Sequence, residues 1–240
     1  KNNKEKIRRL YFTQDRAPLF GGLCKYLSKR KAPYNLVEPK ELEKLCGSIH
    51  HQGVVAMIDE PEIKQLSSKE ISLWIKNKQH AILLDRIGNA NNLGAIVRSA
   101  AFFGIKNIII PDDEAQSSIT TSSYRVAEGG MEFVNIFSTS SSIKLLKDVE
   151  GKMVRIGTDL SARKTVSAIH GLCKSKSALI ILGNEERGIS EKVRENCDEL
   201  VIIPFLGMNE GKSSQVESLN VAQAASIILY ELSKDEFYRK

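Results

Sequence analysis

The pattern of apolar and polar positions changes near residue 60. Beyond that point the chain carries five continuous apolar runs rich in β-branched residues, at 80–85, 107–111, 153–158, 178–183 and 199–204. Runs of this kind are typical of strands that are buried on both faces of a parallel sheet. Helical patterns separate them, at 92–104, 140–148, 188–196 and 218–233. Strands that alternate with helices predict an α/β domain with a parallel sheet.

The first 60 residues hold shorter segments. Strand patterns lie at 6–13, 34–37 and 53–58, the last as a buried strand, and helix patterns lie at 17–31 and 39–47. Residues 59–70 are polar, contain Pro61 and show no clear period, which predicts a linker. We therefore expect a small α/β domain over residues 1–62 and a larger α/β domain over residues 63–240.

Charge is distributed unevenly between these two parts. Residues 1–65 hold 13 basic and 8 acidic side chains, a net charge of +5, whereas residues 66–240 hold 22 and 21, a net charge of +1. A basic lobe beside a neutral body suits a polyanionic partner such as RNA. A solvated surface that happens to carry lysines explains the charge equally well.

Composition adds few candidate sites of other kinds. No apolar run approaches the ~20 residues that a membrane helix needs, so we expect no membrane segment. The four cysteines, at 24, 46, 173 and 197, form no CxxC pair and favour free thiols in a reducing, cytoplasmic setting. His50 and His51 lack further ligand-type neighbours, and we expect no metal site.

The loop after the run at 80–85 enters a nearly apolar helix. Asn92 is a candidate N-cap for that helix. Arg98 is the only charged residue between positions 88 and 105, and it lies about 130° from the centre of the apolar face. We expect its guanidinium to reach back toward the helix entrance. The alternative is that it pairs with a nearby carboxylate or reaches solvent.

Two further loops follow buried strands, where ligands of open α/β sheets bind. One runs over 182–190 and carries adjacent carboxylates, Glu185 and Glu186, before a helix that Ser190 is expected to cap. The other follows Pro204 and leads to the last helix, with Ser218 as a candidate cap and Asn220 just inside. Neither the dinucleotide nor the P-loop pattern of glycines is present.

Taken together, the three loops resemble the three motifs of the SpoU/TrmH family of RNA ribose methyltransferases, within the SPOUT superfamily. The matching residues are Asn92-Leu93-Gly94 with Arg98, then Leu182-Gly183-Asn184-Glu185 with Gly188, then Ile203-Pro204, Gly207 and Ser218-Leu219-Asn220-Val221. The resemblance covers about 80–233. The first 60 residues, with HHQGVVAMI near their end, resemble the small substrate-binding domain of many members.

The resemblance implies a fold and an activity. The fold is a parallel-sheet SPOUT domain with a C-terminal trefoil knot, preceded by a small α/β substrate-binding domain. The activity is methyl transfer from S-adenosyl-L-methionine to a ribose 2′-hydroxyl of tRNA or rRNA. The implied assembly is a homodimer, in which Arg98 of one subunit meets the cofactor site of the other, with no metal and no membrane partner.

The resemblance also assigns residues. Those implied in catalysis are Arg98, Asn92, Glu185, Ser218 and Asn220. Those implied in cofactor binding are Leu182, Gly183, Asn184, Ile203, Pro204, Gly207, Ser218 and Leu219. An arginine stays protonated at neutral pH, so we expect Arg98 to stabilise the developing alkoxide and not to act as a free base. Asn92 is expected to position the ribose or orient Arg98, and Glu185 to hold Arg98 or the sugar.

The chain departs from the family pattern at two places. Asn89-Ala90 stands where the family usually has Asp-Pro, which predicts a less rigid loop. Extra residues, roughly 208–215, lie between Gly207 and Ser218. These departures leave open a second interpretation, a non-catalytic RNA-binding protein that keeps the fold. A third, another nucleotide-dependent α/β enzyme, is disfavoured by the missing phosphate-loop motifs.

Overall fold

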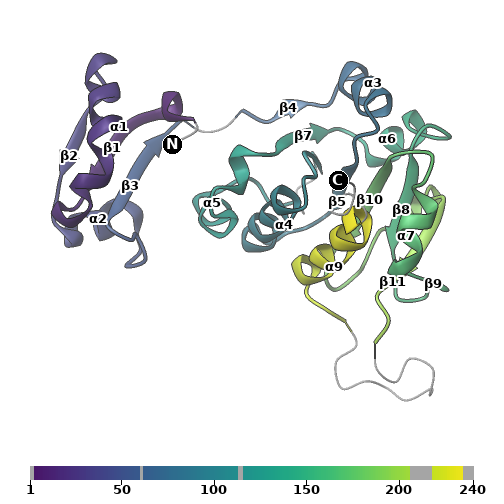
Figure 1. Ribbon diagram of the computed structural model, residues 1–240. Helices are drawn as coiled ribbons and strands as arrows, with labels where there is room; N and C mark the ends of the chain where they lie inside the picture. Colours follow the sequence, from purple (N-terminus) through teal and green to yellow (C-terminus); the bar gives the residue numbers. More distant parts are fainter. Residues whose placement is uncertain (1–2, 60–61, 113–115, 206–217, 235–240) are drawn as a thin grey trace. The chain divides into compact units, whose positions relative to one another are not determined.

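The computed structural model describes residues 3–59, 62–112, 116–205 and 218–234 (Figure 1). The chain divides into two compact units, Lys1–Glu62 and Ile63–Lys240. Among the described residues, no helix combines the length and the apolar character that crossing a membrane requires.

The first unit is a three-stranded sheet between two helices. Its strands are β1 (Ile7–Phe12), β2 (Tyr34–Leu36) and β3 (Val54–Ile58), its helices are α1 (Ala17–Lys29) and α2 (Pro39–Cys46), and its 3-10 turns are η1 (Lys4–Lys6) and η2 (Gln14–Arg16). The strand order is β2-β1-β3, with β2 parallel and β3 antiparallel to β1.

Alternation along β1 explains this packing. Leu10 and Phe12 point to one face, where they join Leu27 of α1 in a small core. Tyr11 points to the other face and packs with Leu42 of α2. The predicted strand at 53–58 is present, but the expectation that it is buried is wrong. As β3 it lies at an edge of the sheet, and its last three residues are exposed.

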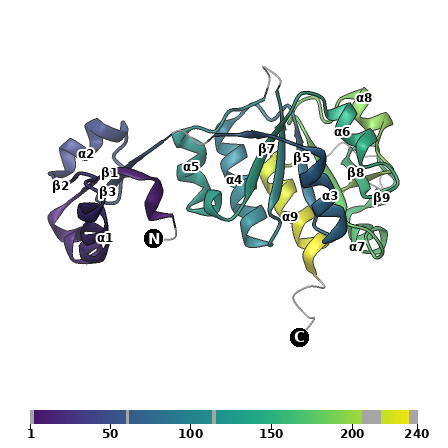
Figure 2. The same cartoon turned by 90° about the horizontal axis from the view of Figure 1, so that it is seen from above.

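The second unit is built on one eight-stranded sheet (Figure 2). The order is β4-β7-β6-β5-β10-β8-β11-β9, and every neighbouring pair is parallel. The strands are β4 (Lys64–Gln65), β5 (Ala81–Asp85), β6 (Asn107–Pro111), β7 (Asn135–Thr139), β8 (Val154–Thr158), β9 (Lys164–Thr165), β10 (Ala178–Gly183) and β11 (Glu199–Ile202). The five strands expected from the apolar runs are therefore all present in one parallel sheet.

Helices cover both faces of this sheet. They are α3 (Ser68–Lys76), α4 (Ala90–Phe102), α5 (Thr121–Ala127), α6 (Ser142–Asp148), α7 (Ile169–Leu172), α8 (Glu191–Glu195) and α9 (Val221–Ser233), with the turns η3 (Gly130–Glu132) and η4 (Val166–Ala168). Alternate residues of β5 serve two cores. Ile82 and Leu84 face α4 and α9, and Ala81 and Leu83 face α3, α6 and α8. Figure 1 shows α9, in yellow, beside α4, and the two helices are in contact.

The linker expected over residues 59–70 is wrong in extent. Strand β4 occupies Lys64–Gln65, and α3 begins at Ser68. Ser67 caps α3, because its side chain accepts a hydrogen bond from the backbone N–H of Glu70. A serine three residues before a glutamate is a start signal for a helix. The helix start was not predicted from the sequence because Ser67 and Glu70 lie in a polar stretch that was interpreted as a linker.

Several short elements were not expected from the sequence. Strand β7 lies between β4 and β6, although Asn135–Thr139 contains few strongly apolar residues. Helix α5 is seven residues long, too short for a 3.6-residue period to be recognised. The connection from β11 to α9 runs through residues 206–217, which lie outside the described residues. The trefoil knot therefore stays a prediction.

Gly94 lets α4 and α5 pack closely. A Cβ atom at this position would lie 2.5 Å from the carbonyl oxygen of Ser123 and 3.0 Å from Cβ of Val126, both in α5. Approach this close leaves room for a hydrogen atom only. The glycine of the first motif is therefore explained by helix packing, because α5 lies directly against the turn of α4 that carries Asn92.

We expect Gly94→Ala to destabilise the second unit, although alanine is the better helix former by about 1 kcal/mol. Overpacking costs about 1–3 kcal/mol, so the free energy of unfolding should fall by about 1 kcal/mol net. Denaturation followed by fluorescence of Trp74, the only tryptophan, measures this change. Gly171→Ala in α7 is the control, because open space surrounds that position, and it should leave stability unchanged or raised. An equally stable Gly94→Ala protein would contradict the packing argument.

Candidate functional site

Three loops meet at the carboxyl edge of the large sheet. Strands β5 and β10 are neighbours and run parallel, so the loops that follow them leave at the same edge. The N-terminus of α9 joins them there. Three side chains connect these segments: Asn92 in α4, Glu185 after β10, and Asn220 before α9. We call these three residues the amide–carboxylate cluster.

The hydrogen bonds of the cluster converge on one oxygen atom. Oε1 of Glu185 accepts a short hydrogen bond from Nδ2 of Asn92 and a second, of 2.7 Å, from Nδ2 of Asn220. Asn220 also donates from Nδ2 to Oδ1 of Asn92 at 3.1 Å. The other oxygen of Glu185, Oε2, accepts no hydrogen bond from the described residues. The cluster thus fixes the carboxylate and leaves one acceptor available at an exposed position.

The helix caps differ from those expected. Asn92 is not an N-cap, because α4 begins at Ala90 and Asn89 caps it by accepting from the N–H of Asn91 at 2.8 Å. Asn92 is instead a buried residue of the first turn, 8% exposed. The departure Asn89-Ala90 is therefore mild, since an asparagine caps about as well as an aspartate and alanine is a good helix former at the next position.

At the start of α9, Ser218 is not the cap either. The helix begins at Val221, and Asn220 lies at the N-cap, not inside the helix. Its Oδ1 accepts from the N–H of Ala222 at 2.9 Å, which leaves Nδ2 for the cluster. Ser218 is exposed, and its side chain makes no hydrogen bond to the described residues. One asparagine thus starts the helix and completes the cluster.

The loop that presents Glu185 is a tight hairpin. Asn184 and Gly188 exchange backbone hydrogen bonds of 3.0 and 2.8 Å. The side chain of Asn184 accepts from the N–H groups of Glu186 and Arg187 and donates to the carbonyl of Arg86. At Gly183, a Cβ atom would lie 2.2 Å from the carbonyl carbon of Gly188. Glycine is therefore required at position 183, and Asn184 shapes the loop.

Arg98 does not join the cluster within one chain. Its Nη2 pairs with Oε2 of Glu128 at 2.9 Å, and 57% of its side chain is exposed. It lies six residues after Asn92, which is about 9 Å along the helix and about 240° around it. The expectation that it reaches back toward the helix entrance is wrong, whereas contacts of Arg98 with Asn92 or Glu185 of a second subunit stay a prediction. The alternative, pairing with a nearby carboxylate, is what the structure shows.

The residues expected to bind a cofactor lie at the same edge, with one exception. Leu182 and Gly183 are buried at the end of β10, Ile203 is half-buried, and Pro204 is exposed after β11. Leu219, before α9, is 44% exposed. Gly207 lies outside the described residues. Among the described residues, no group of three or more histidine, cysteine, aspartate or glutamate side chains could hold a metal ion.

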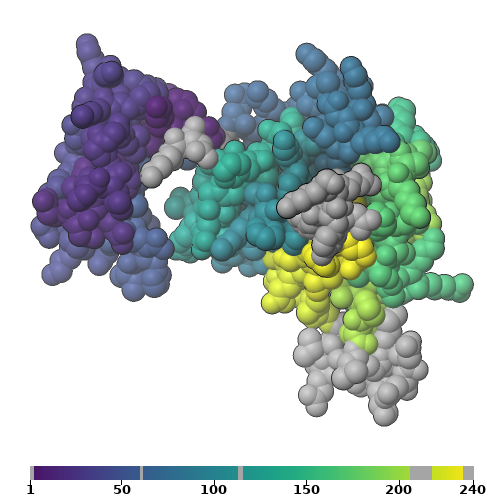
Figure 3. All heavy atoms as spheres, viewed as in Figure 1, coloured from purple at the N-terminus to yellow at the C-terminus, as the bar shows by residue number. Residues whose placement is uncertain are grey.

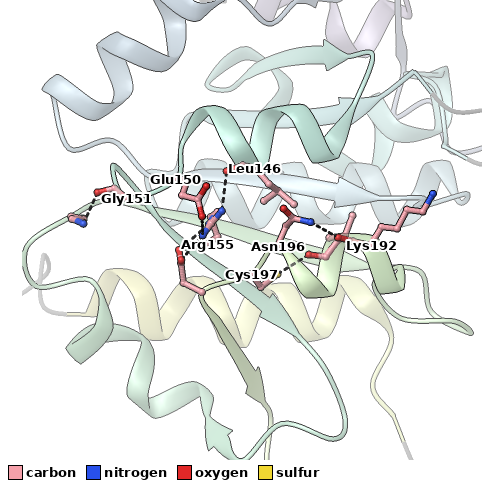
Figure 4. A network of polar contacts seen from close by, with 10 residues as sticks. Leu146, Glu150, Gly151, Arg155, Lys192, Asn196 and Cys197 are labelled. Atoms are coloured by element: carbon pink, nitrogen blue, oxygen red, sulfur yellow. Dashed lines mark hydrogen bonds and ion pairs between the residues drawn. The ribbon is translucent and has the colours of Figure 1, made fainter.

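A charged network that sequence analysis did not predict lies elsewhere in the sheet (Figure 4). Arg155 in β8 is 6% exposed and donates to both carboxylate oxygens of Asp198, at 3.0 and 2.6 Å. It also contacts Glu150 and the carbonyl of Leu146. The hydrogen bond from Arg155 lowers the pKa of Asp198 below its usual value. Arg155 stands near the amino end of its strand, at the opposite edge from the cluster, so the network is structural.

A surface depression of about 390 Å³ also lies away from the cluster, lined by residues 161–164, 194 and 197–200. Two of its cationic side chains have carboxylate partners. Lys164 pairs with Glu199 at 2.5 Å, and Arg194 pairs with Asp159 at 3.4 Å. Side chains from three separate segments converge instead at the carboxyl edge, in the amide–carboxylate cluster.

The parallel sheet with helices on both faces makes the second unit an α/β domain, and the polar cluster lies at the edge of the sheet where such domains bind ligands. Comparison with protein families identifies the class further. Residues 79–230 match the SpoU rRNA Methylase family, and residues 1–64 match the family described as RNA 2'-O ribose methyltransferase substrate binding. The chain belongs to the SpoU rRNA methylase family, which confirms the resemblance seen in the sequence.

Two curated relatives illustrate the similarity. The 23S rRNA (guanosine-2'-O-)-methyltransferase RlmB of Acinetobacter baylyi is 32% identical over 194 residues, which is 79% of this chain and 73% of that protein. An uncharacterized tRNA/rRNA methyltransferase of Mycobacterium avium is 30% identical over 197 residues, which is 81% of this chain and 60% of that protein. The chain therefore spans only part of the length of these relatives.

Solved structures share the fold. AviRb, a SpoU methyltransferase of Streptomyces viridochromogenes in complex with AdoMet, matches with a TM-score of 0.73 at 23% identity, over 97% of this chain and 84% of that chain. An AdoMet-bound rRNA methyltransferase from Sinorhizobium meliloti matches with a TM-score of 0.75 at 20% identity, over 96% and 80%. The expected α/β fold class is confirmed.

We expect Asp198→Asn to lower the free energy of unfolding at pH 7 by about 1–3 kcal/mol. Removing one partner of a fully buried pair costs more, but 36% of the Asp198 side chain is exposed. Because the folded-state pKa is lowered, this stabilisation is present above the unfolded-state pKa of about 4 and is lost as the pH falls through the folded pKa. Trp74 fluorescence during denaturation at pH 7 and pH 3 measures both effects. Equal acid sensitivity in D198N and wild type would contradict the assignment.

Proposed function

We propose that this protein transfers a methyl group from S-adenosyl-L-methionine to a ribose 2′-hydroxyl of tRNA or rRNA. The observation that carries the proposal is the amide–carboxylate cluster at the carboxyl edge of the sheet, in a chain that belongs to the SpoU family. The relatives that act on RNA support the substrate class.

The carboxyl edge has a carboxylate and apolar surfaces that suit such a cofactor. The exposed carboxylate of Glu185 complements a positively charged sulfur, and the exposed side chains of Phe205 and Leu219 offer apolar surface for an adenine ring. When bound, the cofactor supplies a methyl group on a good leaving group. The residues that would hold it are Leu182, Gly183, Asn184, Ile203, Pro204, Gly207, Ser218 and Leu219. We also propose the trefoil knot of the superfamily for this C-terminal part.

Glu185 is suited to orient the ribose. Its Oε1 is fully engaged by Asn92 and Asn220, so the carboxylate cannot rotate freely, and Oε2 can accept a hydrogen bond from the 2′-hydroxyl. A hydroxyl held in one direction toward the methyl group reacts faster than a mobile one. Asn92 and Asn220 therefore act through Glu185, while Ser218 is an exposed group beside the site.

Arg98 is suited to stabilise the oxygen that becomes negative during transfer. A guanidinium keeps its charge at neutral pH and can grip a neighbouring phosphate with two N–H groups. In one chain it lies on the other side of α4 from the cluster and faces solvent. A second copy of the chain would therefore supply Arg98 to the cluster, and the active site is shared between two subunits.

Exposed apolar side chains support a homodimer. Phe102 at the end of α4 is 79% exposed, and Ile227 and Tyr230 in α9 are 37% and 48% exposed. The ring of Phe103 lies 6.3 Å from that of Tyr230, so the aromatic groups of the two helices adjoin. Figure 3 shows α9, in yellow, at the surface of the second unit. Contiguous exposed apolar surface is typical of protein interfaces.

The first unit is proposed to bind the RNA substrate. It carries most of the excess positive charge of the chain, and residues 1–64 match the substrate-binding family. Lys4 lies 4.3 Å from the ring centre of Tyr26, and Arg30 lies 5.6 Å from it. Such groups bind phosphates and stack on bases. The four cysteines are free thiols, which suits the reducing cytoplasm where these RNAs are found.

The activity itself is tested with purified protein, labelled cofactor and total RNA. We expect label in dinucleotides that resist alkali, because a methylated 2′-oxygen cannot attack the adjacent phosphate. RNA binding without cofactor uptake would instead support the alternative, a non-catalytic RNA-binding protein. We include this alternative because, in the single chain, Arg98 pairs with Glu128 and does not join the amide–carboxylate cluster.

We expect Arg98→Ala to lower the rate of transfer at least about 100-fold and to leave the affinity for the cofactor unchanged, because the proposed role of Arg98 is toward the ribose oxygen and phosphate of the RNA and not toward the cofactor. Single-turnover transfer and calorimetric titration measure the two effects. Arg163→Ala, which removes an exposed arginine near the depression, is the matched control for the loss of one charge. Full activity in Arg98→Ala would contradict the role given to this residue.

A further inference from the structure

The turn that follows α5 is pressed against α4 at Arg98. A Cβ atom on Gly130 would lie 3.1 Å from Cα of Arg98 and 3.3 Å from the carbonyl oxygen of Val97. Gly129 has a φ of +88°, so two glycines bring the backbone of the turn onto the helix. The turn reaches the helix at the residue whose charge the proposed reaction needs, six residues beyond the amide–carboxylate cluster.

Glu128, the first residue of this turn, has an unusual backbone conformation. It is the C-cap of α5, with a φ of +44° and a ψ of +47°, in the left-handed region. Glycine or asparagine is usual at such helix ends, because a side chain with a Cβ is strained there. A glutamate at this position lowers stability relative to glycine, so its side chain needs another explanation.

The contact of Glu128 with Arg98 does not compensate for this strain. The side chains of Arg98 and Glu128 are 57% and 62% exposed, and exposed ion pairs stabilise proteins very little. Among the described residues, the carboxylate of Glu128 has no other partner than Arg98. Stability therefore explains neither the glutamate nor its contact with Arg98. The explanation that is left is an effect of Glu128 on the position of the Arg98 guanidinium.

The geometry points to Glu128 as a positioning residue for Arg98, an inference that rests on the proposed function. Oε2 of Glu128 holds Nη2 of Arg98 at 2.9 Å. The Nε and Nη1 groups of Arg98 donate no hydrogen bond to the described residues, so they stay available for the ribose oxygen and a neighbouring phosphate. Fixing one edge of a long side chain removes rotamer freedom before the substrate arrives.

The test exploits the backbone strain. Glu128→Gly removes the carboxylate and relieves the positive φ, so the variant should fold and melt at the same temperature as wild type or higher. We expect its kcat at saturating RNA and cofactor to fall about tenfold, with the cofactor KM within about twofold. Glu128→Gln keeps the size but loses the charge and should also lose activity. Lys78→Gly is the matched control, since Lys78 has a φ of +50° and is exposed after α3.

The outcomes separate this inference from the proposed function. A wild-type protein that transfers no methyl group overturns the proposed function, and the inference with it. A wild-type protein that is active, together with a Glu128→Gly variant whose kcat is unchanged or raised, overturns the inference alone. A melting temperature that falls with kcat in Glu128→Gly assigns a structural role to Glu128 and overturns the inference as well.

Discussion

The site depends on one carboxylate oxygen that binds two side-chain amides. Oε1 of Glu185 accepts from Asn92 of α4 and from Asn220 at the start of α9, residues that stand 128 positions apart. The parallel sheet makes this possible, because it sends the loops of separate strands to one edge. Gly183 and Gly94 allow the close backbone approaches that support it.

Helix α4 carries, on different sides, two of the side chains to which we assign roles. Asn92 faces inward to the cluster, and Arg98 faces solvent beside Glu128. A helix cannot bring both to one point, since six residues turn it by about 240°. The proposed site made from two copies would resolve this constraint, and the proposed role of Glu128 is to keep the guanidinium ordered at the surface. The proposed dimer would explain why Asn92 and Arg98 lie on different sides of α4, and the strained turn at Glu128 would explain how Arg98 is held for it.

The sequence was sufficient where local patterns decide the structure. Buried strands such as Ala178–Gly183 are long and β-branched, and their alternation with helices led to the fold class. Caps were misplaced because several asparagines compete at the start of α4, and hydrogen bonds decide between them. The predicted environment of Arg98 was wrong because a helical wheel shows which way a side chain points but not which residue of another segment lies there. Glu128 is brought there by α5, a helix too short to be recognised.

The most direct test mixes two impaired variants, Arg98→Ala and Glu185→Gln, each expected to transfer methyl groups poorly alone. In a mixed dimer with a shared site, both changes fall in one site and the other site is intact. Random exchange of subunits should then restore about one quarter of the wild-type activity. The measurement is the rate of label transfer to RNA after co-refolding. Activity no higher than that of the separate variants would contradict a site built from two chains.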